Sequence, residues 1–253
     1  MSIDILLLGG AAVVVLGVVV AKIGDRLGLP ALLLFLGLGV LMGLPSGGQS
    51  FNNAALAHDL GFAALALILA DGGLATKWRN LRPAIGPALV LATAGVAVTI
   101  ALLSGFLYVL GIPLAVAVLV AATMAPTDSA AVFSILRRAP IPPRVKAMLE
   151  GESGLNDAPT VLLVLAATSL ALRDTAYGDL PFTALLILGQ LVGGLLLGAA
   201  FGWIGGKLLH NLALPSSGLY PLASLGWAVI AYGLGTLIHV SGFAAVYVCS
   251  VVL

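Results

Sequence analysis

Charged residues are scarce in this chain, and their scarcity excludes most classes of protein. Asp, Glu, Lys and Arg make up 8% of the 253 residues, against about 25% in soluble domains. So few charges cannot cover the surface of a water-soluble protein, which excludes a soluble enzyme. The net charge of +1 excludes a basic nucleic-acid binder, and the apolar share of 61% excludes a disordered chain. The single cysteine, Cys249, excludes an internal disulfide framework and a cysteine-based metal cluster.

Long apolar runs instead predict an integral membrane protein built from helices. A spanning helix needs about 20 apolar residues, and the runs here are continuous, whereas the strands of a membrane barrel alternate in polarity. Breakers such as Gly111-Ile112-Pro113 divide the longer runs. The predicted fold is all-α and polytopic, with spans over 3–21, 29–43, 55–71, 84–108, 113–137 with an interruption, 145–172, 181–206, 218–239 and 242–253.

The first and last predicted spans lead to different expectations. Asp4 and the lack of a basic residue ahead of the first apolar run are unlike a cleaved signal peptide, so we expect a retained helix. The last span stops at Leu253, at about half the length that a bilayer needs. We therefore expect the chain to be the N-terminal part of a longer protein, truncated after about nine spans.

Basic residues fall on one side of the predicted membrane. Ten of the eleven Lys and Arg residues lie in or at the edges of the loops that follow odd-numbered spans, and the exception is Arg173. Because cytoplasmic loops carry the excess of Lys and Arg, the N-terminus is expected outside. This orientation puts Gln49 outside and Arg138 inside the cell.

The first polar motif lies midway along the fifth span, from Thr123 to Ala130. Pro126 has no backbone N–H, and it pushes the residue before it out of helical geometry. We expect the helix to break there and to free backbone groups around Thr127 and Asp128. Irregular backbone at membrane depth is tolerated where it lines a cavity or is buried in protein. The alternative is a kinked helix with a structural Asp128 that neighbouring residues satisfy.

The second polar motif runs from Glu150 to Thr160 into an apolar helix. Helical periodicity places Glu150, Ser153 and Asp157 on one face. It places Glu152 about 140° away from Asp157, so Glu152 is expected to point elsewhere or to act through water. Such an oxygen-rich face suits hard cations such as Na⁺, K⁺ or H⁺. The alternative, a solvated helix N-terminus, explains the two glutamates but explains Asp157 badly, because Asp157 lies two turns in.

Together the motifs resemble those of the monovalent cation:proton antiporters, most closely the bacterial NhaP-like, potassium/proton branch. They are Ala125-Pro126-Thr127-Asp128-Ser129 and, about 25 residues later, Glu150-Gly151-Glu152-Ser153-Gly154-Leu155-Asn156-Asp157. Leu69-Ala70-Asp71-Gly72-Gly73-Leu74 is also similar to that branch, and the similarity covers nearly the whole chain. The paired motifs at this spacing are highly specific.

The resemblance implies a secondary active exchanger of K⁺ or Na⁺ for protons in the cell (inner) membrane. It implies about thirteen spans in inverted repeats, an outside N-terminus and a homodimer. In the family, the broken helix that carries the Thr-Asp pair crosses a second broken helix from the later repeat. That helix and a later core arginine have no counterpart in these 253 residues, so the ion site is expected to be incomplete here.

The resemblance also implies which residues hold the ion. Asp157 would be the carboxylate that binds the cation and the proton, and Asp128 with the backbone of Thr127 would line the site. Ser153 would offer a hydroxyl ligand to Na⁺ or K⁺. If the proton and the cation compete for one buried carboxylate, and only the neutralised site crosses the barrier, competition alone gives antiport.

Two further residues complete the implied site. Glu152 would make a water-mediated contact, and Asn156 would be a fixed hydrogen-bond partner. Family members with two adjacent aspartates form the electrogenic branch, so Asn156 ahead of Asp157 resembles the electroneutral branch. No cofactor is expected, because the sequence contains no nucleotide or phosphate motif.

Two other functions fit a polytopic helical protein. A cation channel would favour a continuous pore lining over one competing carboxylate, and a non-transporting scaffold leaves the intramembrane Asp128 and Asp157 without a purpose. A proton flux driven by an imposed cation gradient separates the three, because a channel gives uncoupled current and a scaffold gives neither.

The remaining features have plainer interpretations. Glycines recur every four residues on the seventh span and predict close helix packing, at Gly194, Gly198, Gly202 and Gly206. Three histidines near span ends are expected to be solvated at the interface, with pH sensing as the alternative: His58, His210 and His239. Asp71 is expected at the interface, with gating as its alternative.

Overall fold

The computed structural model describes residues 3–27, 31–42, 53–128, 132, 140–171, 180–212 and 215–253. Every regular element in these ranges is helical, which confirms the all-α prediction for the part of the chain described. The chain divides into two compact units, residues 1–59 and 60–253.

The first unit contains two helices and the beginning of a third. α1 spans Ile3–Leu27, α2 spans Ala31–Met42, and α3, Ala54–Ala75, starts in this unit and continues into the second. α1 and α2 lie against each other near Gly17 and Phe35. Most described side chains of these helices are exposed although they are apolar.

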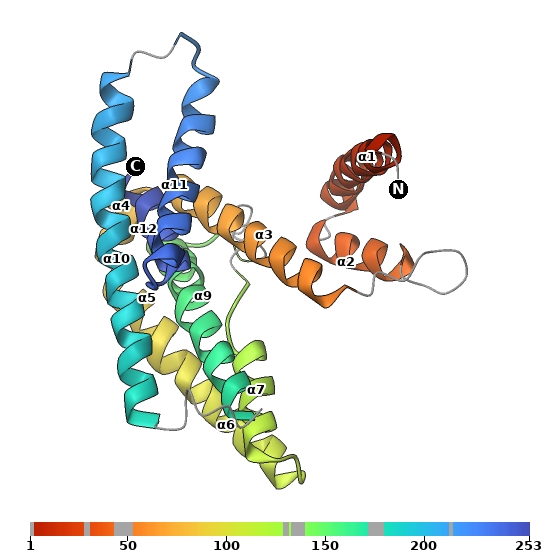
Figure 1. The fold of residues 1–253 in the computed structure, drawn as a ribbon, viewed down its shortest axis with the longest axis vertical. Coiled ribbons are helices and arrows are strands. Elements are labelled where there is room, and N and C mark those ends of the chain that lie inside the picture. The colour runs from red at the N-terminus through yellow and green to blue at the C-terminus, as the bar shows by residue number, and fades with distance from the viewer. Residues whose placement is uncertain are drawn as a thin grey trace. The chain divides into compact units, whose positions relative to one another are not determined.

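The second unit holds the remaining helices (Figure 1). A nearly continuous helical rod begins with α4 at Trp78–Leu81 and ends with α6 at Val96–Val109. Within the rod lie η1 (Arg82–Ala84), α5 (Ile85–Val90) and the π-helical turn η2 (Leu91–Gly95). The other helices are α7 (Leu114–Met124), α9 (Pro143–Ala171), α10 (Leu180–Asn211), α11 (Leu219–Leu237) and α12 (Gly242–Val252).

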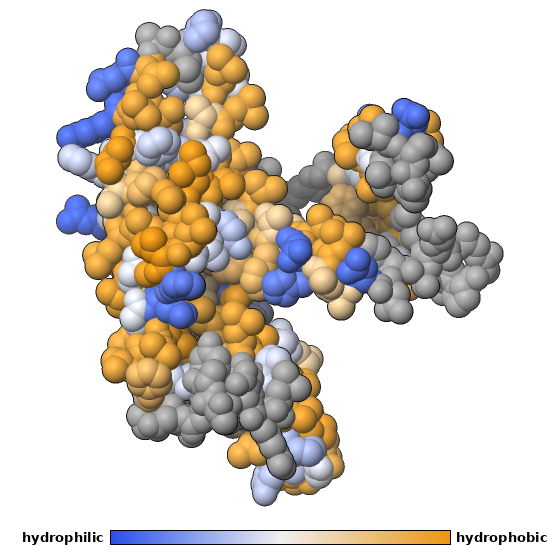
Figure 2. Space-filling model, viewed as in Figure 1, coloured by the Kyte–Doolittle hydropathy of each residue, from blue (hydrophilic) through white to orange (hydrophobic). Residues whose placement is uncertain are grey.

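The surface is the reverse of that of a soluble protein. Figure 2 shows apolar side chains over most of the visible face, and a contiguous apolar surface of that kind marks a membrane or partner-binding face. Among the described residues, four helices are long and apolar enough to cross a membrane: Leu7–Gly24, Ala54–Ala75, Trp78–Val109 and Phe182–Asn211. Shorter apolar helices are Leu32–Leu41, Leu114–Met124 and Gly242–Val252. These features are those of a membrane protein, and the division into nine spans stays a prediction.

The core of the second unit forms around α12. Residues 241–247 are all buried, and α12 packs against both α10 and α11. Glycines of α10 allow this approach, because a Cβ on Gly198 would lie 2.5 Å from the Ala245 carbonyl oxygen, and one on Gly202 2.8 Å from that of Cys249. An aromatic cluster of Phe62, Tyr232 and Phe243 extends the core toward α3.

The predicted glycine stripe of α10 is correct for three of its four members. Gly194, Gly198 and Gly202 meet α12, but nothing lies within 4 Å of a Cβ built on Gly206. Gly205 makes the corresponding contact instead, against the Trp227 indole. The reason is that four residues advance an α-helix by about 400°, so a four-residue repeat drifts off a straight face within a few turns.

Candidate functional site

The fifth predicted span is interrupted at the position of Pro126. α7 ends at Met124, and the Ala125 N–H donates the last hydrogen bond of the helix to Ala121. Thr127 and Asp128 have no helical assignment, as expected where a proline removes a donor and restricts the residue before it. Residues 129–131 and 133–139 lie outside the described residues, so the rest of this predicted span is not placed.

Small residues on α9 let neighbouring helices come close to its polar segment. A Cβ on Gly151 would lie 2.6 Å from Leu81 and 3.2 Å from Ala88, so this glycine seats α9 against α4 and α5. Gly154 makes an equally close contact with the Tyr247 ring of α12. Consequently the polar side chains nearby are buried, with exposed fractions of 7% for Glu152 and 0% for Asn156.

The interrupted span and α9 meet through one hydrogen-bonded network. The Thr127 hydroxyl donates to Glu152 Oε2 at 3.0 Å and lies 2.7 Å from Ser153 Oγ. Asn156 Nδ2 donates to Glu152 Oε1 at 2.8 Å and to Thr127 Oγ1 at 3.1 Å. Both oxygens of Glu152 therefore accept hydrogen bonds from neutral donors.

The water-mediated contact of Glu152 with an ion stays a prediction. Its carboxylate bonds directly to Thr127 and Asn156. Glu152 lies about 140° around the helix from Asp157, and the network forms on the side of α9 that carries Glu152, Ser153 and Asn156. These positions i, i+1 and i+4 share one side of a helix.

The two aspartates flank this network along the chain. Asp128 directly follows Thr127 and is exposed, while Asp157 directly follows Asn156 and is half-buried. Within the described residues, the Oδ1 atom of Asn156 is buried and accepts no hydrogen bond. Oxygen atoms of carboxylate, hydroxyl and amide groups thus gather where the interrupted span meets α9, and such atoms suit a hard cation.

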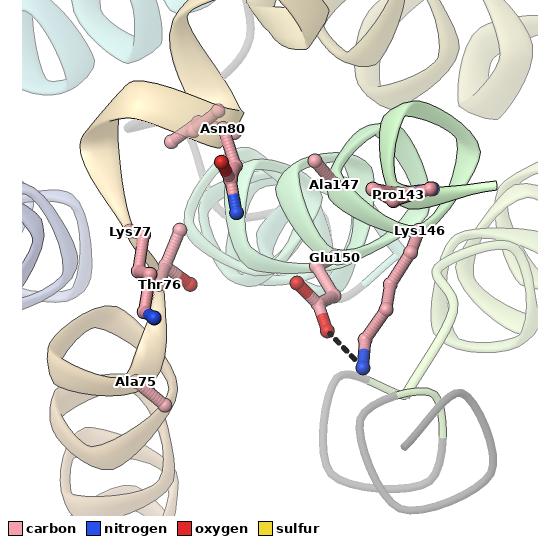
Figure 3. Close-up of a pocket in the computed structure, with 9 residues that line it drawn as sticks. Ala75, Thr76, Lys77, Asn80, Pro143, Lys146, Ala147 and Glu150 are labelled. Carbon is pink, nitrogen blue, oxygen red and sulfur yellow. Dashed lines mark ion pairs between the residues drawn. The ribbon is translucent and has the colours of Figure 1, made fainter. Parts of the chain in front are cut away.

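Glu150 is placed apart from the network, in the wall of a pocket of about 230 Å³ (Figure 3). Its Oε1 lies 3.9 Å from Lys146 Nζ, one turn earlier on α9. Thr76 and Asn80 come to the same pocket from the end of α3 and from α4. Glu150 therefore lies in the polar N-terminal part of α9, as the alternative interpretation of a solvated helix terminus predicts.

One polar residue near the site was not predicted from the sequence. Tyr247 lies on α12, almost a hundred residues after the motifs, and it is 3% exposed. Its ring covers Gly154 of α9. A tyrosine in an apolar helix is a weak sequence signal, and only the fold brings it next to the polar segment.

Comparisons with known proteins agree with these observations. Residues 11–253 match the family model described as "Sodium/hydrogen exchanger, transmembrane". The chain is 34% identical to the K⁺/H⁺ antiporter NhaP2 of Shewanella sp. (strain ANA-3) over 249 residues, which cover 97% of this chain and 43% of that protein. It is 37% identical to the K⁺/H⁺ antiporter NhaP of Alkalimonas amylolytica, over 92% of this chain and 41% of that one.

A more distant relative is named for Na⁺ and not for K⁺. The Na⁺/H⁺ antiporter NhaS2 of Synechocystis sp. is 26% identical over 190 residues, which cover 75% of this chain and 34% of that protein. The chain thus spans less than half the length of these relatives.

Proposed function

The chain belongs to the sodium/hydrogen exchanger family, and from this premise we propose that it exchanges a monovalent cation for protons across the cell membrane. The observation that carries the proposal is the hydrogen-bonded network that joins Thr127 to the buried Glu152 and Asn156 beside Asp157, in a protein that is otherwise apolar. Ionisable groups inside a membrane are costly and mark ion or proton pathways by default. Relatives named as K⁺/H⁺ and Na⁺/H⁺ antiporters support the same function.

In the proposed mechanism, Asp157 binds the cation and the proton in competition. Asp128, the Thr127 backbone and the Ser153 hydroxyl supply further oxygen atoms. Asn156 and Glu152 hold the interrupted span against α9 through their hydrogen bonds with Thr127. Burial disfavours an isolated negative charge, so Asp157 is expected to cross the barrier only when a cation or a proton neutralises it.

One titrating carboxylate predicts that exchange moves no net charge. One proton returns for each monovalent cation, because Asn156 stands where a second carboxylate would carry another charge. We expect transport by the full-length protein in liposomes to follow the two concentration gradients and to be insensitive to a potential clamped with an ionophore. Running the assay with K⁺ and with Na⁺ identifies the cation. A transport rate that follows the imposed potential would show that the one-carboxylate account is wrong.

We also propose that the N-terminus faces outward in the inner membrane, which the position of the Lys and Arg residues supports. Cysteines introduced at Leu110 and at Arg144, both exposed in the structure, are expected to react from opposite sides of intact cells. A membrane-impermeant maleimide should label the Leu110 position from outside and the Arg144 position only after lysis. The native Cys249 is buried and gives little background. Labelling of both positions from outside would refute the orientation.

A further inference from the structure

Two hydroxyl groups on α12 are buried without hydrogen bonds among the described residues. They belong to Tyr247 and Ser250, which are 3% and 2% exposed and lie one turn apart. A buried hydroxyl that forms no hydrogen bond loses its hydration without compensation, so each such group in a native protein calls for an explanation. The surroundings of the two hydroxyls differ, and only the Tyr247 hydroxyl lies next to the candidate site.

Tyr247 lies against the polar segment of α9. A Cβ built on Gly154 would meet the Tyr247 ring and lie 2.7 Å from its hydroxyl oxygen. Glu150 precedes Gly154 by one turn and Asp157 follows it by one turn, and both carboxylates act electrostatically on this phenol. Ser250 instead packs on Gly73 of α3, where a Cβ would lie 2.5 Å from the Ser250 Cβ.

Helical geometry locates Asp157 between two groups of neutral oxygen atoms. With about 100° per residue, Asp157 lies about 40° from Ser153 on one side and about 60° from Gly154 on the other. The Ser153 hydroxyl lies 2.7 Å from the Thr127 hydroxyl, and a Cβ built on Gly154 would lie 2.7 Å from the Tyr247 hydroxyl oxygen. An ion held by the Asp157 carboxylate would therefore have the interrupted span on one side and α12 on the other.

We propose that the Tyr247 hydroxyl is a further oxygen ligand for the transported cation, on the α12 side of Asp157. The inference rests on the proposed exchange function and adds a residue outside both sequence motifs. A phenol oxygen keeps two lone pairs for a hard cation. This position of the Tyr247 ring requires a glycine at residue 154 of α9, because any side chain there would displace the ring.

The test is Tyr247→Phe in the full-length protein, reconstituted in liposomes. We expect the KM for the cation to rise about three- to tenfold, the effect of losing about one hydrogen-bond-sized interaction, while the maximal rate stays within about twofold. Tyr232→Phe is the matched control, since it removes the same hydroxyl from a tyrosine that packs on Phe243 and Gly242 of α12. Its KM should equal that of the wild type.

Measurements at two pH values separate a lost ligand from altered proton competition. A lost ligand raises the KM at both values, whereas a rise confined to the lower pH would overturn the proposal. Gly154→Ala gives a second, independent variant that keeps the hydroxyl and moves it, and it should raise the KM as well. Wild-type KM in either folded variant overturns the inference. A wild-type protein without coupled exchange would instead refute the proposed function.

Discussion

Asp157→Asn is expected to abolish cation/proton exchange and to leave the protein folded. The substitution keeps the size of the side chain and removes the carboxylate that, in the proposed mechanism, attracts the cation and takes the proton. Asp157 is half-buried on α9, directly after Asn156, whose side chain is fixed by two hydrogen bonds. Coupled flux in liposomes, measured on the full-length protein after gel filtration has shown a folded species, tests this expectation.

A matched control is available on α3. The exposed carboxylate of Asp59 lies 3.2 Å from the His58 imidazole, and Asp59→Asn removes the same charge far along the chain from both motifs. Exchange should then be unchanged. Asp128→Asn should reduce exchange severely without abolishing it, because the backbone around Thr127 also offers oxygen atoms. Near-normal coupled flux from well-expressed Asp157→Asn protein would remove Asp157 from the mechanism.

Composition and apolar runs were sufficient to predict an all-helical membrane protein, because they depend on the energetics of each segment alone. The break after Met124 was predictable for the same reason, since Pro126 acts on its own helix. Charge scarcity and the uneven placement of Lys and Arg are likewise properties of single segments and loops.

Contacts between segments far apart in the chain were not predictable in this way. Periodicity gives the angle between Glu152 and Asp157 on one helix, but it does not say which neighbour packs on which side. Thr127 meets α9 on the Glu152 side, and Tyr247 meets it at Gly154. No residue type in either motif specifies these partners, so neither the direct hydrogen bonds of Glu152 nor the position of Tyr247 could be predicted from the sequence.

Asn156→Asp is expected to lower exchange at neutral pH by about tenfold or more and to shift its pH profile. Asn156 Nδ2 now donates to Glu152 Oε1 at 2.8 Å and to Thr127 Oγ1 at 3.1 Å. An ionised aspartate donates to neither group and puts a second carboxylate in contact with Glu152. Two like charges at that distance cannot both ionise cheaply, so either one proton is retained or the network opens.

The structure also supplies a rescue for this variant. In the double variant Glu152→Gln with Asn156→Asp, the glutamine amide can donate to the aspartate, which exchanges donor and acceptor and restores the original charge of the pair. We expect the double variant to recover exchange to within about fivefold of wild type, and Glu152→Gln alone to be milder than Asn156→Asp. Because the two side chains contact each other, their effects should be strongly non-additive. If the double variant is no more active than Asn156→Asp, the hydrogen bond between Asn156 and Glu152 does not support transport, and Asn156 acts on Asp157 alone.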